Sequence, residues 1–153
     1  MDGYSSTSHS VFRLTYHFIF VTKYRKPVIS DAMGDYMKKE AERLCAGYGC
    51  ELLTAETDRD HMHLLVSMLP SSCVTTVVRN LKTQLSKSIH AHPVFGPEAQ
   101  KMLHGNAPFW SPSFFAATTG SVSMETVKSY IESQRTDEHK RKYTKKSSYW
   151  SRE

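Results

Sequence analysis

Two histidines separated by one residue are the first feature of this sequence that could do chemistry. His61 and His63 lie in a run that reads as a β-strand, residues 61–68. Because side chains alternate across a strand, both imidazoles should point to one face while Met62 points to the other. Two imidazoles on one face can share a divalent metal ion, and Asp60 could orient one of them by accepting its ring N–H. One surface histidine beside one core histidine is the other interpretation, and the pair alone does not decide between them.

A tyrosine and a glutamine four residues apart supply the groups that such a site would lack. Tyr130 and Gln134 are neighbours on one face of the last predicted helix, which begins near Ser123 and carries Val127 and Ile131 on its apolar side. A phenol facing the sheet can be a covalent nucleophile, and an amide oxygen can be a third metal ligand. A core tyrosine is the alternative for this position. Only the combination of two histidines, a tyrosine and a glutamine favours catalysis.

The elements that must position these residues follow the order βαββαβ. Strands are predicted at 13–22, which we expect to be central, and at 50–57, 61–68 and 109–117. One helix, capped by Ser30, runs to about Gly47, and a second, capped by Ser71 or Ser72, runs to about His90. Residues 93–108 contain several prolines and glycines and are predicted to be a loop. The order predicts a ferredoxin-like α+β fold, an antiparallel sheet with two helices on one face and an additional C-terminal helix.

Length and composition place the chain among globular proteins. Its 153 residues predict a single domain at 1–146, followed by a basic flexible tail at 147–153. No apolar run approaches the roughly 20 residues that span a bilayer, so a cytoplasmic location is expected. Cys45, Cys50 and Cys73 form no C-x-x-C pair, which argues against a disulfide framework and against a cysteine-based zinc site.

The positive charge of the chain is concentrated at its C-terminus. The net charge is +5 with histidine neutral, and residues 135–153, with seven basic and three acidic side chains, account for +4 of it. A basic segment on a nearly neutral body fits a polyanionic partner such as nucleic acid. A solvated tail that only improves solubility fits the charge equally well.

Taken together, these residues resemble the single-tyrosine HUH transposases of the smallest bacterial and archaeal insertion sequences. HMH at 61–63 is similar to the HUH motif, and YIESQ at 130–134 is similar to the tyrosine-x-x-x-glutamine motif of the family's catalytic helix. YHFIFVTKYRKP at 16–27 resembles the first strand and its basic exit, and residues 109–120 resemble the fourth strand and the turn at Gly120. The family usually has a glycine where this chain has Ser113.

The resemblance implies a metal-dependent transposase that cleaves and rejoins single-stranded DNA and recognises hairpins at the ends of the insertion sequence. Tyr130 would attack a phosphodiester, leaving a 5'-phosphotyrosine and a free 3'-hydroxyl, and a second strand's hydroxyl would later reverse the bond. His61, His63 and Gln134 would bind Mg²⁺ or Mn²⁺, with no nucleotide cofactor. Family members act as homodimers in which the tyrosine helix of one chain can complete the histidine pair of the other.

Several cations and one aromatic residue are candidates for contacts with DNA. They are Lys23, Tyr24, Arg25 and Lys26 after the first strand, and Arg79 and Lys82 on the second helix. Two alternatives to the transposase remain open at this point. A non-catalytic nucleic-acid-binding module of RNA-recognition-like fold shares the βαββαβ order. Such a module would carry a Lys/Arg-Gly-Phe-x-Phe-like run on its third strand, where this chain has histidines. A domesticated HUH endonuclease would have the same sequence features.

Overall fold

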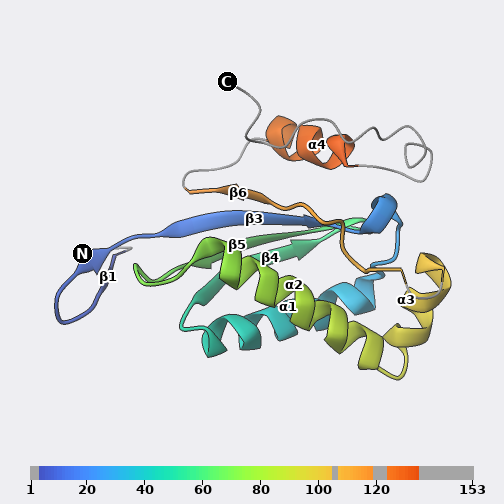
Figure 1. The fold of residues 1–153 in the computed structure, drawn as a ribbon, viewed down its shortest axis with the longest axis horizontal. Coiled ribbons are helices and arrows are strands. Elements are labelled where there is room, and N and C mark those ends of the chain that lie inside the picture. Colours follow the sequence, from blue (N-terminus) through green and yellow to red (C-terminus); the bar gives the residue numbers. More distant parts are fainter. Residues whose placement is uncertain (1–3, 105–106, 119–123, 135–153) are drawn as a thin grey trace.

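One four-stranded antiparallel sheet forms the centre of the protein. The computed structural model describes residues 4–104, 107–118 and 124–134. The strands are β3 (Thr15–Val21), β4 (Glu51–Thr57), β5 (His61–Ser67) and β6 (Phe115–Ala117), in the spatial order β4-β5-β3-β6. Helices α1 (Asp31–Gly47) and α2 (Val74–Ala91) cover one face of the sheet, and α4 (Met124–Ser133) lies over the other (Figure 1). The predicted ferredoxin-like α+β fold is confirmed.

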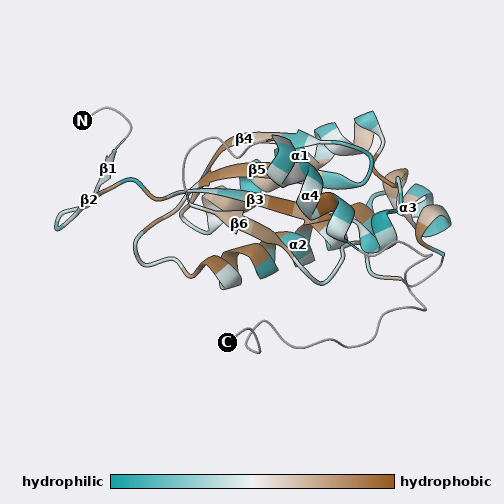
Figure 2. Ribbon diagram, turned by 90° about the horizontal axis from the view of Figure 1, so that it is seen from above, coloured by the Kyte–Doolittle hydropathy of each residue, from teal (hydrophilic) through white to brown (hydrophobic). Residues whose placement is uncertain are grey.

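Strand β3 is buried on both of its faces, which makes it the central strand that was predicted. Phe18 and Phe20 point into the main core between the sheet and the helices α1 and α2. Ile19 and Val21 point the opposite way, into a small second cluster with side chains of β6 and α4. Since side chains alternate along a strand, burial on both faces requires cover on both sides of the sheet. Figure 2, seen from above, shows α4 lying over the central strands.

The first two helices occupy the predicted stretches, but their N-termini differ. Ser30 caps α1 as predicted, because its side chain accepts a hydrogen bond of 3.2 Å from the Met33 amide. In α2 the cap position belongs to Cys73, which makes no side-chain cap hydrogen bond, so the prediction of a serine cap was wrong. The Ser72 amide donates to the Leu69 carbonyl instead, and this turn occupies the residues that precede the helix.

A third helix stands where a loop was predicted, and this is the main correction to the fold. Helix α3 (Phe95–Leu103) buries Phe95, Ala99 and Leu103, which are spaced four residues apart and so share one face. A Cβ at Gly96 would lie 2.5 Å from the carbonyl oxygen of His90, so only glycine permits this close approach to the end of α2. Pro97 stands in the first turn, where its missing N–H has no consequence for the helix.

The fourth strand is shorter than predicted. Only residues 115–117 pair with β3, and within 109–114 a single isolated bridge joins Trp110 to Thr22. Pro112 has no N–H to donate to a strand partner, which interrupts the ladder. Phe109 and Trp110 are instead buried in the main core. Residues 109–114 therefore form a packed segment along the sheet edge.

Other features complete the described part of the chain. A small ribbon of β1 (Ser5–Ser6) and β2 (Val11–Phe12) precedes the sheet, and a single turn of 3-10 helix, η1 (Lys23–Arg25), follows β3. None of the helices described is long and apolar enough to cross a membrane. Cys45, Cys50 and Cys73 are free thiols, the first two buried and the third exposed. Gly120 and the basic tail lie outside the described residues, so the domain boundary at 146 stays a prediction.

Candidate active site

The histidine pair lies on the sheet face that α4 covers. In the register of β3 and β5, His61 is opposite Val21 and His63 is opposite Ile19. Both imidazoles are half-buried, whereas Met62 between them is fully buried in the main core on the other face. The predicted orientation of the two histidines is therefore confirmed.

Asp60 holds the first histidine by a hydrogen bond. Its Oδ1 accepts from His61 Nδ1 at 2.8 Å, and its Oδ2 lies 3.8 Å from Arg25 Nε. The bond from His61, with a smaller contribution from the Arg25 charge, lowers the pKa of Asp60 below its ordinary value. A carboxylate on Nδ1 places the lone pair of neutral His61 on Nε2, which is the arrangement of a metal-binding histidine.

His63 has a partner that the sequence did not indicate. His17 on β3 contacts it, with His17 Nδ1 and His63 Nε2 hydrogen-bonded at 3.1 Å. Burial lowers the pKa of His63, and the neighbouring His17 and His61 lower it further. His63 is therefore neutral at physiological pH, the state in which imidazole can bind a metal ion. The missed signal was the alternation of β3, which puts His17 on the same face as Ile19.

Tyr130 packs over the cross-strand partners of both histidines. Its ring belongs to the cluster of Ile19 and Val21 and lies 5.5 Å from the Phe115 ring. Its hydroxyl donates a hydrogen bond of 3.3 Å to Ser113 Oγ. Burial raises the pKa of Tyr130, so the phenol is protonated at neutral pH. The prediction that this side chain faces the sheet is confirmed; Val127 lies outside the described side chains.

Gln134 lies in a hollow shared with the basic exit of β3. The hollow has a volume of about 340 Å³ and is lined by Lys23, Tyr24, Ser111, Pro112, Ser113, Ser133 and Gln134. Ser111 Oγ donates a hydrogen bond of 2.9 Å to Gln134 Oε1, the oxygen that would be a metal ligand. The structure thus brings Gln134 together with two of the predicted DNA-binding residues, Lys23 and Tyr24.

The tyrosine helix and the histidine pair lie on the same face of the sheet. Among the described residues, no hydrogen bond, ion pair or ring contact joins Tyr130 or Gln134 to His61 or His63. The described residues also contain no cluster of three histidine, cysteine or carboxylate side chains that could hold a metal ion.

The turn η1 presents cations under backbone strain. Tyr24 and Arg25 both adopt positive φ angles of 56°, a region that non-glycine residues rarely enter and that is common at functional sites. The Lys23 ammonium lies 5.0 Å from the centre of the Tyr24 ring. Arg25 Nε is buried and makes no hydrogen bond to the described residues. The half-buried Lys26 completes the predicted basic exit.

The two predicted DNA contacts on α2 have different surroundings. Arg79 is exposed, whereas the Lys82 ammonium donates hydrogen bonds of 2.7 Å to the Ser111 carbonyl and 2.9 Å to the Ser113 carbonyl. Burial lowers the pKa of Lys82 to about 8. Lys82 thus anchors the backbone of the segment whose serine side chains hold Tyr130 and Gln134.

Comparison with known proteins identifies relatives of this chain. Residues 10–134 match the profile of the family described as "Transposase IS200 like". The chain is 32% identical over 124 residues to the ISDra2 transposase TnpA of Deinococcus radiodurans, covering 81% of this chain and 86% of the relative. It is 27% identical over 138 residues to the transposase for insertion sequence element IS200 of Salmonella typhimurium, covering 88% and 85%.

A solved structure supports the same relationship. The crystal structure of a protein from Deinococcus radiodurans described as a transposase superposes with a TM-score of 0.77 at 26% identity. The match covers 86% of this chain and 98% of the other. The family match spans all four strands of the sheet and α4, and it favours a transposase over an RNA-recognition-like binding module.

Proposed function

Because this chain belongs to the family of IS200-like transposases, we propose that it cleaves and rejoins single-stranded DNA with Tyr130 as the nucleophile. The resemblance of the YIESQ segment to the family's catalytic helix supports this role for the tyrosine. The substrate that we propose is single-stranded DNA with hairpins at the ends of the insertion sequence.

One observation carries the proposal. The ring of Tyr130 packs on Ile19 and Val21, and these are the direct cross-strand partners of His63 and His61. Opposed residues in an antiparallel pair have Cβ atoms about 4.5–5.5 Å apart. The tyrosine helix thus covers the neighbours of the histidine pair, on the sheet face to which both histidines point.

The covalent step transfers one phosphoryl linkage. The phenolic oxygen of Tyr130 forms a bond to the phosphorus of a phosphodiester, and the bond from phosphorus to the 3'-oxygen breaks. The phenolic proton leaves along the hydrogen bond to Ser113 Oγ towards solvent, and the departing 3'-oxygen takes a proton to become a hydroxyl. Attack by the 3'-hydroxyl of a second strand on the 5'-phosphotyrosine reverses these bonds and restores the phenol.

The donor atoms present fit a divalent metal ion. His61, His63 and Gln134 would hold Mg²⁺ or Mn²⁺, because imidazole and amide oxygen form a mixed nitrogen and oxygen set without thiolates. Asp60 would orient His61 through the hydrogen bond to Nδ1. When bound, the ion polarises the scissile phosphate and stabilises the charge that develops on it.

We further propose that the active form is a homodimer. Among the described residues of one chain, no hydrogen bond, ion pair or ring contact joins Tyr130 or Gln134 to the histidine pair. A helix α4 from a second copy can supply the glutamine ligand that the histidines lack. This arrangement matches the one implied by the resemblance to the family.

The basic exit of β3 is the proposed path of the DNA strand. Lys23 and Tyr24 line the hollow that contains Gln134, so a phosphate near the ligand set meets a cation and an aromatic ring. Arg25, whose side chain is partly exposed and lies beside Asp60, adds positive charge to this path.

The test uses single-stranded oligonucleotides tiled across the DNA that flanks the gene. They are incubated with the protein and Mg²⁺ or Mn²⁺, and the products are separated on a denaturing gel. We expect a covalent protein–DNA band that needs the metal ion and disappears in Tyr130→Phe. Tyr16→Phe is the matched control, because that ring stacks on Phe18 in the main core, and it should keep the band. An adduct that persists in Tyr130→Phe would overturn the proposal.

A further inference from the structure

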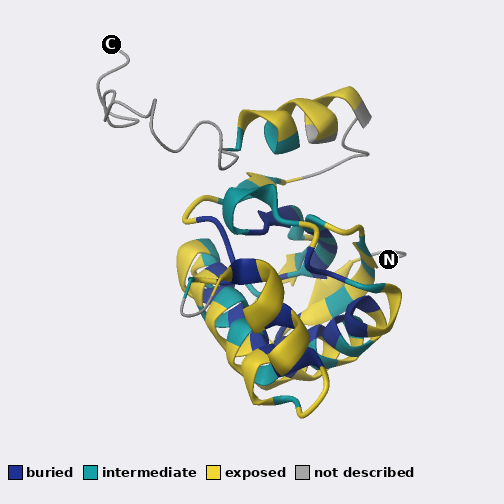
Figure 3. Ribbon diagram, turned by 90° about the vertical axis from the view of Figure 1, so that its right-hand side faces the viewer, coloured by how far each residue is buried: buried dark blue, intermediate teal, exposed yellow. Residues whose placement is uncertain are grey.

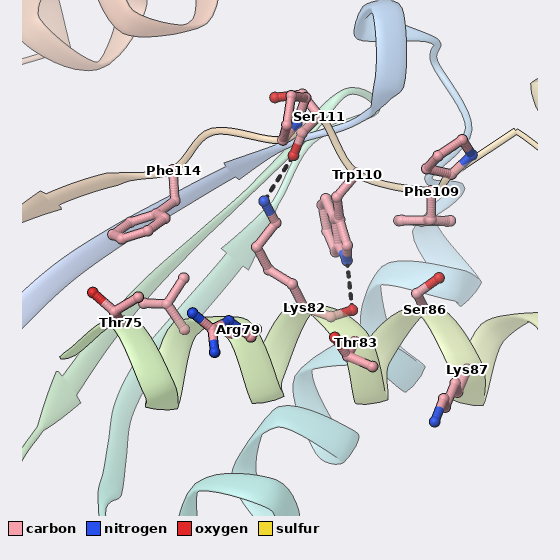
Figure 4. A pocket seen from close by; sticks show the side chains of 13 residues that line it. Thr75, Arg79, Lys82, Thr83, Ser86, Lys87, Phe109, Trp110, Ser111 and Phe114 are labelled. Atoms are coloured by element: carbon pink, nitrogen blue, oxygen red, sulfur yellow. Dashed lines mark hydrogen bonds between the residues drawn. The ribbon is translucent and has the colours of Figure 1, made fainter. Parts of the chain in front are cut away.

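A groove separate from the histidine pair lies between α2 and the segment 108–114. Its volume is about 600 Å³, within the range of roughly 300–1,000 Å³ that is usual for small-ligand sites. Figure 4 shows side chains of α2 along one wall and the aromatic residues of the segment along the other. It is lined by Thr75, Val78, Arg79, Lys82, Thr83, Ser86, Lys87, Pro108, Phe109, Trp110, Ser111, Pro112 and Phe114.

Both walls of the groove lack negative charge. Helix α2 contains no aspartate or glutamate, and neither does the sequence 104–118. Arg79 and Lys87 are exposed on the helix wall and free to bind an anion. Lys82 lies between them with its ammonium on two carbonyls, so it adds positive potential rather than a direct contact. The groove is therefore complementary to a polyanion.

The opposite wall offers an aromatic surface. Phe114 is half-buried and lies across the groove from Arg79 (Figure 4). Trp110 is held rigidly, because its Nε1 donates a hydrogen bond of 3.1 Å to the Lys82 carbonyl and its ring packs edge-on against Phe20. Aromatic side chains beside cations are the usual means of binding unpaired nucleotides, since bases stack on rings while phosphates pair with cations.

The groove adjoins the candidate active site. Ser111 and Pro112 line both this groove and the hollow that contains Gln134, so a single stretch of backbone separates the two. A DNA strand that places a phosphate in the hollow can cross this backbone and enter the groove. A double helix is too wide to enter a hollow of this size, whereas an unpaired nucleotide can.

We propose that the groove binds an unpaired nucleotide of the single-stranded DNA substrate, next to the scissile phosphate. Arg79 and Lys87 bind its phosphates, and Phe114 stacks on its base. This inference rests on the proposed function, because it assigns a second binding site to the same DNA strand.

Binding is measured by the fluorescence of Trp110 in a Trp150→Phe background, which removes the only other tryptophan of the chain. The probe is a short oligothymidylate, titrated over a series of salt concentrations. We expect saturable quenching, because a base in the groove lies beside the indole. The double variant R79Q/K87Q should bind more weakly, with a salt slope smaller by about 1.4, since each single-strand phosphate contact contributes roughly 0.7.

The matched control is K39Q/K101Q, which removes the same charge from two exposed lysines that do not line the groove. All four side chains are exposed, so the fold should tolerate both double variants. Equal affinities and salt slopes for the two variants would overturn the proposal. Binding without quenching, or equal competition by a blunt duplex, would also overturn it.

Failure of this inference is distinguishable from failure of the proposed function. The covalent-adduct assay is run on R79Q/K87Q with a large excess of oligonucleotide, so that weaker binding no longer limits the reaction. An adduct together with unchanged oligothymidylate affinity rejects the groove and leaves the tyrosine chemistry standing. No adduct in the parent protein rejects the tyrosine chemistry, while the quenching experiment still decides whether the groove binds DNA.

Discussion

The Tyr130 hydroxyl donates a hydrogen bond to Ser113 Oγ across 3.3 Å, and this bond ties α4 to the segment that precedes β6. Two residues earlier, Ser111 Oγ holds the amide oxygen of Gln134 at 2.9 Å. The two proposed functional side chains of α4 are thus held by two serines of one short segment. Lys82 anchors the backbone carbonyls of both serines.

Replacing Ser113 should slow cleavage without weakening the metal site. Ser113→Ala removes the acceptor of the phenolic hydrogen, and one hydrogen bond contributes about 0.5–1.5 kcal/mol. We expect the rate of adduct formation at saturating DNA to fall roughly threefold to tenfold, and Ser113→Thr to restore it. Ser113→Gly, which installs the residue usual in the family, should behave as the alanine variant does. Rates equal to the parent in both variants would show that this bond does not position the phenol.

Replacing Ser111, in contrast to replacing Ser113, should weaken metal binding. Ser111→Ala leaves Gln134 Oε1 without its hydrogen-bond donor, and loss of such a partner of a metal ligand typically weakens metal affinity by about 10–100-fold. Titration of Mn²⁺ followed by electron paramagnetic resonance measures this affinity directly. Ser113→Ala is the control and should bind Mn²⁺ as the parent protein does. Unchanged Mn²⁺ affinity in Ser111→Ala would remove Gln134 from the ligand set.

The stability of the metal-free protein should decrease as the pH falls through the ordinary range of histidine. Burial and neighbouring histidines lower the pKa of His63 in the folded state, so the unfolded chain takes up the proton first. The free energy of unfolding should therefore decrease as the pH drops below about 6.5. Urea unfolding in the presence of a chelator, at a series of pH values, measures the effect. His63→Gln should reduce the slope, and His9→Gln at an exposed position should not; equal slopes for both would contradict the assignment.

The contact between α2 and α3 should make one glycine sensitive to substitution. Gly96→Ala places a Cβ 2.5 Å from the His90 carbonyl oxygen, so backbone must move, and overpacking of this kind costs about 1–3 kcal/mol. Gly47→Ala is the matched control, because nothing lies within 4 Å of a Cβ there and alanine favours the helix. Urea unfolding of the two variants should move their midpoints in opposite directions. A Gly96→Ala protein as stable as its parent would show that the helices can separate without strain.

Local sequence signals account for most of the fold. The period of α1 and the serine before it predicted that helix to within a residue, because capping and periodicity are properties of the helix itself. Helix α3 was missed because Gly96 and Pro97 indicate a loop. The close contact of Gly96 with the end of α2 stabilises this helix, and the periodicity of a sequence cannot predict such a tertiary contact. For residues 109–114 the sequence predicted a strand that the structure does not contain. Aromatic residues favour strands, but here Phe109 and Trp110 are buried in the core outside any strand.

The site was predictable only where its residues share one element. The alternation of β5 placed His61 and His63 together, and helical spacing placed Tyr130 beside Gln134. Their partners come from elsewhere in the chain. His17 meets His63 through strand pairing, and Ser113 meets Tyr130 through the packing of α4. Such contacts depend on the register of paired strands and on how a helix packs against the sheet. The periodic pattern of a single sequence predicts neither of these.

The two clusters of buried side chains have a consequence for hydrogen exchange. Helices α1 and α2 share the main core, whereas the described apolar side chains of α4 belong to the small cluster with Ile19 and Val21, and most of the helix surface is exposed (Figure 3). Opening of α4 therefore leaves the main core intact and requires only a fraction of the global unfolding free energy. Its amide protons should exchange through local opening, while those of α1 exchange only when the whole molecule unfolds. The helix that carries Tyr130 is in this sense a separate cooperative unit.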